Sequence, residues 1–174
     1  SYPTKQLCSN ITTTIEKNDQ VLLCGNNGTG KSSIINTIIG AFSGKQSGEI
    51  LFSSALKIST VRQDYSDNHG SLRSFASSSN YDQFLNLLRK LGMERVTFNV
   101  PIEEMSMGQQ KKVELARSLA EPAHLYLWDE PLNYLDTYNQ QQLIQLIQEK
   151  RPPMLIVEHD QNFIKQIATK KIEI

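Results

Sequence analysis

The chain has 174 residues, a length that suits one domain with a full hydrophobic core. Lysine plus arginine and aspartate plus glutamate each number 18, so the net charge is zero, which argues against a general nucleic-acid-binding surface. No apolar run approaches the roughly 20 residues of a membrane span. The N-terminus has no signal-peptide pattern and Cys8 and Cys24 are the only cysteines, so we expect a cytoplasmic protein.

The first part of the chain predicts strands that alternate with helices. Helices are expected over residues 31–39, where apolar residues recur at helical spacing, and over 82–93. The serine-rich stretch 66–80 predicts a loop. Together with the helix over 82–93, it indicates that residues 66–100 form a small, mainly helical insertion between core segments 1–65 and 101–174. Short apolar or alternating runs predict strands over 9–15, 21–24, 49–52 and 57–61.

The second part of the chain continues this alternation. Ser106, followed three residues later by Gln109, is a capping-box pattern that predicts the start of a helix. On that helix we expect Lys111, Lys112 and Arg117 to lie on the polar face. Strands are predicted over 125–128, 154–157 and 170–174, and helices over 139–150 and 160–168.

The stretch between the second predicted strand and the first helix has the form G-x-x-x-x-G-K-S, a phosphate-binding loop. Its glycines let the backbone curl so that N–H groups point at phosphate oxygens, and the helix N-terminus adds a positive field. Lys31 would reach the β- and γ-phosphates, and the Ser32 hydroxyl would bind Mg²⁺. The predicted nucleotide-binding residues here are Gly25, Asn26, Asn27, Gly28, Thr29, Gly30, Lys31, Ser32 and Ser33.

Later motifs follow this loop in a particular order. They are Gln63, Ser106 to Gln109, Asp129-Glu130, Leu135-Asp136 and His159. In this order the chain resembles the nucleotide-binding domain of ABC ATPases over nearly its whole length. The resemblance implies a single ABC-type ATP-binding domain over 1–174, an α/β P-loop NTPase with a mostly parallel sheet and an N-terminal antiparallel β portion.

The resemblance also implies catalytic roles. Asp129 would hold the hydration shell of Mg²⁺, since hard cations prefer carboxylate oxygen. Glu130 would orient or deprotonate the attacking water, a contribution typically worth about 10²–10⁴-fold. Gln63 would touch Mg²⁺ or the water and sense the γ-phosphate. His159 would contact the γ-phosphate and couple its presence to the conformation of the domain.

Two further parts of the nucleotide site follow from the resemblance. Ser106, Gly108 and Gln109 match the family's Ser-Gly-Gly-Gln signature, with Met107 in place of the first glycine. In the family this motif binds the ATP held by a second domain, so that two domains sandwich two ATPs. Tyr2 is placed like the aromatic residue that stacks on adenine, although a frayed terminus or a core position is an equal alternative.

The stretch 129–136 points to a subclass. It resembles the Glu-Pro-Thr-Asn-His-Leu-Asp pattern of ABC-F proteins, with Leu132 and Tyr134 as departures, whereas transport ATPases more often have serine at Asn133. ABC-F proteins carry two ATPase domains in one chain, lack a membrane domain and bind the ribosome, and some confer antibiotic resistance. The two departures and Trp128 favour the resistance branch. The resemblance thus implies ATP and Mg²⁺ as cofactors, with a second ABC domain and the ribosome as partners.

Two other functions stay open. The main alternative is the ATPase subunit of a membrane transporter, whose partner would be a transporter membrane subunit. A DNA-maintenance ATPase, or a nucleotide-binding module that no longer hydrolyses, is the third possibility. The sequence has no long coiled coil and retains Glu130 and His159, which counts against both forms of the third. Since the first residue is not methionine, we expect a fragment or an excised domain. Because ABC-F proteins carry two ATPase domains and this chain has one that ends soon after the closing strand, we expect it to be the second half of such a protein.

Overall fold

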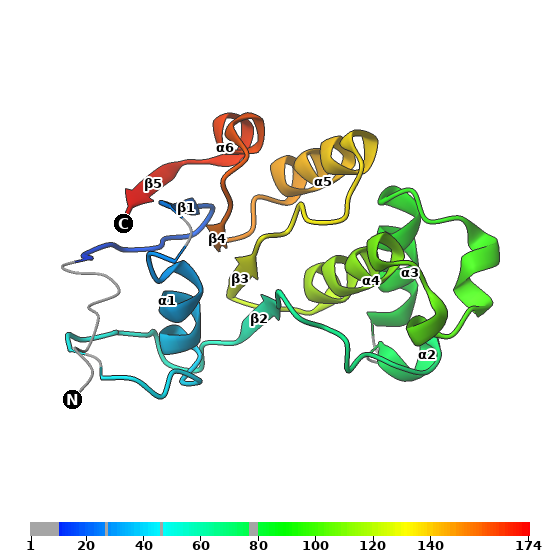
Figure 1. Ribbon diagram of the computed structural model, residues 1–174, viewed down its shortest axis with the longest axis horizontal. Coiled ribbons are helices and arrows are strands. Elements are labelled where there is room, and N and C mark those ends of the chain that lie inside the picture. The colour runs from blue at the N-terminus through cyan, green and yellow to red at the C-terminus, as the bar shows by residue number, and fades with distance from the viewer. Residues whose placement is uncertain (1–10, 27, 46, 77–79) are drawn as a thin grey trace.

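The computed structural model describes residues 11–26, 28–45, 47–76 and 80–174 of an α/β protein (Figure 1). Within these residues five strands form one sheet, in the spatial order β2-β3-β4-β1-β5, and every neighbouring pair is parallel. The strands are β1 (Gln20–Cys24), β2 (Ile58–Val61), β3 (Leu125–Asp129), β4 (Met154–Val157) and β5 (Lys170–Glu173). The α-helices are α1 (Lys31–Ile38), α2 (Leu72–Phe75), α3 (Tyr81–Lys90), α4 (Met107–Ala120), α5 (Thr137–Lys150) and α6 (Gln161–Ile167). Two 3₁₀ helices, η2 (Arg95–Asn99) and η3 (Ile102–Glu104), precede α4.

Both faces of the sheet are covered, because successive side chains of a strand point to opposite sides. Val21 and Leu23 of β1 pack with Ile35 of α1 in one apolar cluster. Leu22 of the same strand belongs to a larger cluster with Trp128 and with residues of α3, α4, α5 and α6. Such near-continuous apolar strands are typical of a parallel sheet that is buried on both faces.

The segment between β2 and α4 is helical. Phe84 and Leu88 of α3 are fully buried in the larger cluster, and α2 and α3 lie beyond α4, at the end of the molecule away from β5 (Figure 1). This arrangement fits the expected helical insertion, whose boundaries at residues 66 and 100 stay a prediction. No described helix has both the length and the apolar character needed to cross a membrane.

Most predicted elements are confirmed, but two strands, the antiparallel portion and one loop are not. The segments 11–15 and 49–52 form no strand, and all strand pairs among the described residues are parallel, so the expected N-terminal antiparallel portion is absent there. A strand needs a hydrogen-bonded neighbour, and neither segment has one among the described residues. Residues 66–80 are not simply a loop, since Ser71 caps the short helix α2 by accepting a hydrogen bond from the Ser74 backbone N–H.

The sheet gathers the ends of its strands at one edge. The phosphate loop follows β1, Gln63 follows β2 and His159 follows β4, while Asp129 is the last residue of β3. Because all five strands are parallel, their carboxyl ends meet at the same edge, the usual ligand-binding edge of open α/β sheets. The fold therefore brings to one place motifs that are far apart in the sequence.

Candidate functional site

The loop between β1 and α1 depends on its glycines. Gly28 and Gly30 have φ angles of 80° and 96°, in the left-handed region that side chains with a Cβ rarely adopt. A Cβ on Gly25 would clash with the carbonyl oxygen of Ile174, which follows β5. The described part of the loop is therefore held close to its neighbouring strand in a conformation that needs glycine.

Lys31, the first residue of α1, places its ammonium inside this loop. The side chain is buried, and Nζ donates hydrogen bonds to the carbonyl oxygens of Gly25 and Asn26, each at 2.8 Å. Half-buried Ser32 and Ser33 complete a first helical turn without an acidic side chain. The ammonium and the positive end of α1 thus act together on an anion at the loop.

Three other positions, Tyr2, Asn27 and Thr29, were predicted to bind the nucleotide. Tyr2 and Asn27 lie outside the residues that the structure describes. Thr29 donates its hydroxyl hydrogen to the carbonyl oxygen of Asn26 at 2.9 Å and so closes the tip of the loop.

Asp129 ends β3 as a buried carboxylate close to the loop. Among the described residues its Oδ1 has no hydrogen-bond partner. Burial raises the pKa of Asp129, the nearby Ser32 hydroxyl opposes this shift, the charge of Glu130 raises the pKa further, and Lys111 and Lys31 lower it. A buried, unpartnered carboxylate oxygen beside a serine hydroxyl suits a hard cation.

Glu130 is fixed by neighbours from two other segments. Its Oε2 accepts hydrogen bonds from Gln63 Nε2 at 3.1 Å and from Asn133 Nδ2 at 2.6 Å. Its backbone N–H donates to the carbonyl oxygen of Val157 at 2.9 Å, and its φ of 48° lies in the left-handed region. The structure therefore joins two predicted site residues, Gln63 and Glu130, directly. Asn133 was singled out in the sequence only as a subclass marker.

His159 lies at the same edge but points into solvent, with 65% of its side chain exposed. No hydrogen bond joins its side chain to the phosphate loop within the described part of the chain. Its backbone N–H donates to Oε1 of buried Glu158 at 2.9 Å, as does that of Asp160 at 3.3 Å. Glu158 Oε2 accepts from the backbone N–H of Leu132 at 3.3 Å, so this carboxylate links the loops after β3 and β4. Sequence reasoning missed Glu158, although an acidic residue ending an apolar strand marks it.

The prediction that the basic residues of α4 lie on a polar face is wrong for Lys111 and Arg117. Lys111 is buried, not on a polar face, with Nζ 5.6 Å from the centre of the Tyr65 ring. Burial lowers the pKa of Lys111 to about 8, opposed first by the carboxylate of Glu114 and then by those at the ends of β3 and β4. Arg117 is also mostly buried, since its side chain is only 20% exposed. The helical pattern could not reveal that this side of α4 packs against β2 and the 62–68 loop.

We expect Lys111→Met to raise the free energy of unfolding near neutral pH. The folded pKa of about 8 lies below the ordinary value of 10.5, so the unfolded chain binds more protons between these two values. Burial of the charged ammonium therefore lowers the free energy of unfolding by about 3 kcal/mol below pH 8. This loss of stability disappears as the pH rises to 10.5.

The measurement is urea unfolding of both proteins at about pH 7 and about pH 10. The exposed Lys165→Met is the matched control, and its difference from wild type is expected to change little. An equal difference in the free energy of unfolding between Lys111→Met and wild type at both pH values would contradict the claim that the buried charge of Lys111 destabilises the protein.

The signature motif begins α4 with the predicted capping box. The Ser106 hydroxyl accepts from the Gln109 backbone N–H at 3.3 Å, and Gln109 Oε1 accepts from the Ser106 backbone N–H at 2.9 Å. A Cβ on Gly108 would lie 2.7 Å from the carbonyl oxygen of Tyr134, so the loop after β3 packs tightly there. Met107 stays exposed. Among the described residues, no hydrogen bond joins this motif to the phosphate loop.

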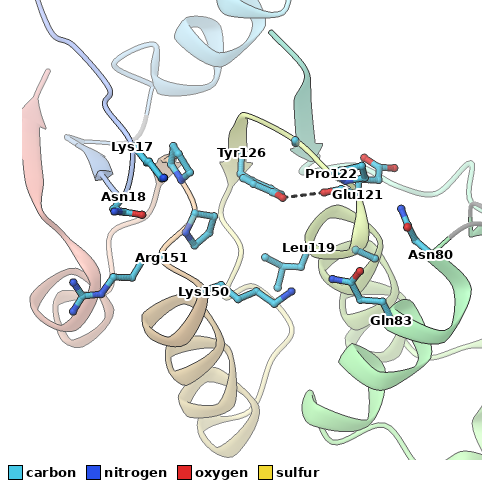
Figure 2. Close-up of a pocket in the computed structure, with 14 residues that line it drawn as sticks. Lys17, Asn18, Asn80, Gln83, Leu119, Glu121, Pro122, Tyr126, Lys150 and Arg151 are labelled. Atoms are coloured by element: carbon cyan, nitrogen blue, oxygen red, sulfur yellow. Dashed lines mark hydrogen bonds between the residues drawn. The ribbon is translucent and has the colours of Figure 1, made fainter.

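Two cavities have no phosphate-loop residue in their lining, although Gln63 lines the second of them. One, of about 460 Å³, lies at the opposite edge of the sheet, and Figure 2 shows that its cations Lys150 and Arg151 point in different directions. The other, of about 440 Å³, is lined by the segment from Gln63 to Asn68 and by residues of the signature region, Met107 among them. Neither has cations converging on one point, as a phosphate site would need.

Comparison with known proteins decides the family. A family model described as ABC transporter matches residues 8–133, most of the chain. The chain belongs to this family. This ABC domain is 27% identical over 179 residues to the ribosome protection protein VmlR of Bacillus subtilis (strain 168), covering 100% of this chain and 32% of the relative. It is 30% identical to elongation factor 3 of Mycosarcoma maydis, covering 97% of this chain and 16% of that protein.

Solved structures agree with the fold. The dimeric bacterial ABC transporter cassette MJ0796 superimposes with a TM-score of 0.77 at 23% identity, covering 97% of this chain and 86% of that one. The sequence relatives confirm the predicted ABC-F-like nucleotide-binding domain, and the family implies ATP hydrolysis. The ABC domain spans about a third of the length of VmlR.

Proposed function

We propose that this ABC domain is one of two ATPase domains of an ABC-F protein that acts on the ribosome. The observation that carries the ATPase part is the placement of Glu130, whose Oε2 is held by Gln63 and Asn133 next to Asp129. A carboxylate fixed in this way can accept a proton from, or orient, a water that attacks the γ-phosphate.

The residues present fit a Mg²⁺ ion. Ser32 and Asp129 would hold it, because Asp129 Oδ1 is buried without a partner among the described residues and Ser32 lies against the same carboxyl group. Gln63 would approach it from β2. Bound Mg²⁺ neutralises charge on the phosphates and usually keeps water and phosphate oxygens as ligands. This agrees with the finding that the described residues contain no cluster of three or more His, Cys, Asp or Glu side chains that could hold a metal ion.

The remaining residues would bind and sense ATP. Lys31 and the loop N–H groups would bind the β- and γ-phosphates. His159, which is exposed, would be free to turn towards the γ-phosphate. Ser106, Gly108 and Gln109 would contact the ATP of a second ABC domain, since no hydrogen bond connects them to the phosphate loop of their own chain in the described segments.

The ribosome is proposed as the partner on two grounds, the names of two relatives and the presence of Asn133, the residue typical of ABC-F proteins. VmlR is named a ribosome protection protein, and elongation factor 3 is a second relative whose name refers to translation. Asn133, which motivates the ABC-F assignment, also holds Glu130 in place at 2.6 Å. Protection from an antibiotic and a cytoplasmic location belong to the same proposal.

The test is sedimentation of the full-length protein that carries this chain. With a non-hydrolysable ATP analogue present, the protein is expected to sediment with ribosomes through sucrose. Lys31→Ala removes charge-assisted hydrogen bonds worth roughly 1.5–3 kcal/mol each, or about 10- to 100-fold in affinity for ATP. At limiting analogue this variant is expected to stay at the top of the gradient. Recovery of the wild type only in the membrane fraction would contradict the ribosome and favour the transporter alternative.

A further inference from the structure

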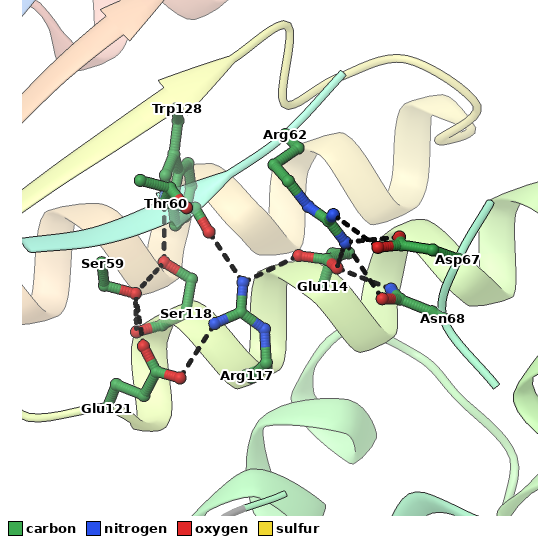
Figure 3. Close-up of polar contacts among 10 residues, drawn as sticks. All are labelled: Ser59, Thr60, Arg62, Asp67, Asn68, Glu114, Arg117, Ser118, Glu121 and Trp128. Carbon is green, nitrogen blue, oxygen red and sulfur yellow. Dashed lines mark hydrogen bonds and ion pairs between the residues drawn. The ribbon is translucent and has the colours of Figure 1, made fainter. Parts of the chain in front are cut away.

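Glu114 is a completely buried carboxylate in the middle of α4. Its Oε1 accepts hydrogen bonds from Asn68 Nδ2 at 2.6 Å and from Arg62 Nη2 at 3.3 Å, and its Oε2 accepts from Arg117 Nη2 at 2.9 Å (Figure 3). Burial alone would raise the pKa of Glu114, but Arg117, Asn68 and Arg62 together hold it below its ordinary value. Glu114 is therefore ionised at neutral pH and bound both to the 62–68 loop and to Arg117 of its own helix.

One segment is the 62–68 loop, which carries a candidate catalytic residue. The Arg62 guanidinium also contacts Asp67 at 2.9 Å and donates to Asn68 Oδ1 at 3.1 Å, so both ends of this loop meet at Arg62. Gln63 follows Arg62 directly and donates to Glu130 at 3.1 Å. The position of Gln63 is therefore one residue away from the contact with Glu114.

The other side of the network fastens α4 to the sheet. Arg117 Nη2 donates to the carbonyl oxygen of Thr60 in β2 at 2.8 Å, and Ser118 Oγ accepts from Trp128 Nε1 at 2.9 Å. Trp128 directly precedes Asp129. The helix that begins at the signature motif is thus tied to both strands that lead into the candidate catalytic residues (Figure 3).

We propose that Glu114 is a positioning residue for ATP hydrolysis, because its carboxylate joins α4 to the 62–68 loop and so holds Gln63 on Glu130. The inference rests on the proposed role of Glu130 as the base. An ionised carboxylate at a buried site cannot leave its cationic partners without a large penalty. A shift of α4, caused by nucleotide at the signature motif, would therefore move the 62–68 loop and change the contact between Gln63 and Glu130.

The first test is Glu114→Gln in the full-length protein that carries this chain. The amide keeps the shape but loses the charge shared by the two arginines. We expect kcat to fall by about tenfold or more, with KM and the affinity for a fluorescent ATP analogue changed by less than about threefold. Glu121→Gln is the matched control, because Glu121 caps the C-terminal end of the same helix and also pairs with Arg117, at 2.8 Å, but has no hydrogen bond to the loop. Its kcat is expected to stay within about twofold of wild type.

A double-mutant cycle separates positioning from general support of the fold. If Glu114 acts through Gln63, then Glu114→Gln lowers kcat by less than about twofold once Gln63→Ala is present. An equal fold-reduction with and without Gln63→Ala overturns the proposal, as does a wild-type kcat for Glu114→Gln.

Arg62→Met serves if Glu114→Gln does not fold, since it keeps the pair of Glu114 with Arg117 and removes a side chain that is 43% exposed. The same cycle with Gln63→Ala is expected to give the same pattern, and additive losses overturn the proposal. Glu130→Gln is measured beside both. A wild-type rate for that variant contradicts the proposed base, whereas additivity alone contradicts only the positioning role.

Discussion

Glu130→Gln is expected to lower the single-turnover rate of ATP hydrolysis by roughly 100-fold or more, while ATP binding stays within about threefold of wild type. The amide oxygen can still accept the hydrogen bonds that Gln63 and Asn133 donate to Glu130 Oε2, so the side chain is expected to keep its place. It cannot accept a proton from water. The loss therefore falls on the chemical step and not on binding.

The measurement uses the full-length protein that carries this chain, with the corresponding change in any second ABC domain. Single-turnover hydrolysis and binding of a fluorescent ATP analogue are recorded on the same samples. Glu173→Gln is a matched control, since Glu173 ends β5 at the same edge of the sheet and is exposed. A rate for Glu130→Gln within about threefold of wild type would show that Glu130 is not the base.

The sequence predicts those parts of the fold and site that depend on residues adjacent in the chain. The runs 125–128 and 154–157 are apolar throughout, which is typical of parallel strands buried on both faces, and β3 and β4 form there. The glycines and Lys31 of the phosphate loop are equally local. In contrast, the segment 49–52 pairs with no strand in the part of the chain that the structure describes, and its Leu51 is 81% exposed.

What sequence reasoning missed is the burial of several charged residues. Lys111 and Arg117 have the spacing of a polar helix face, yet both are mostly buried. Their burial is offset by carboxylates such as Glu114, which helical spacing places beside both cations. Only the fold shows that this side of α4 packs against β2 and the 62–68 loop. Glu158 was missed for the same reason, because its hydrogen-bond partner Leu132 belongs to another loop.

The ABC domain by itself is expected to be a poor ATPase whose activity per mole rises with protein concentration. The phosphate loop, Asp129 and Glu130 lie at one edge of its own sheet. Among the described residues, Ser106 and Gln109 form a capping box with each other and no hydrogen bond with that loop. One domain would then supply the phosphate cradle, the Mg²⁺ ligand and the base, but not the donors that close the site around the γ-phosphate.

Phosphoryl transfer depends on positioning and on electrostatic stabilisation, both of which are weak in a half-site open to water. Mass action then makes the active fraction depend on the concentration of the second domain. Phosphate release is measured over a roughly hundredfold dilution series, where activity per mole is expected to fall by about tenfold or more at the dilute end and to recover when the partner domain is added. Lys31→Ala gives the background rate. A high activity per mole that stays constant to the lowest concentration, in a sample shown to be monomeric, would contradict a site shared between two domains.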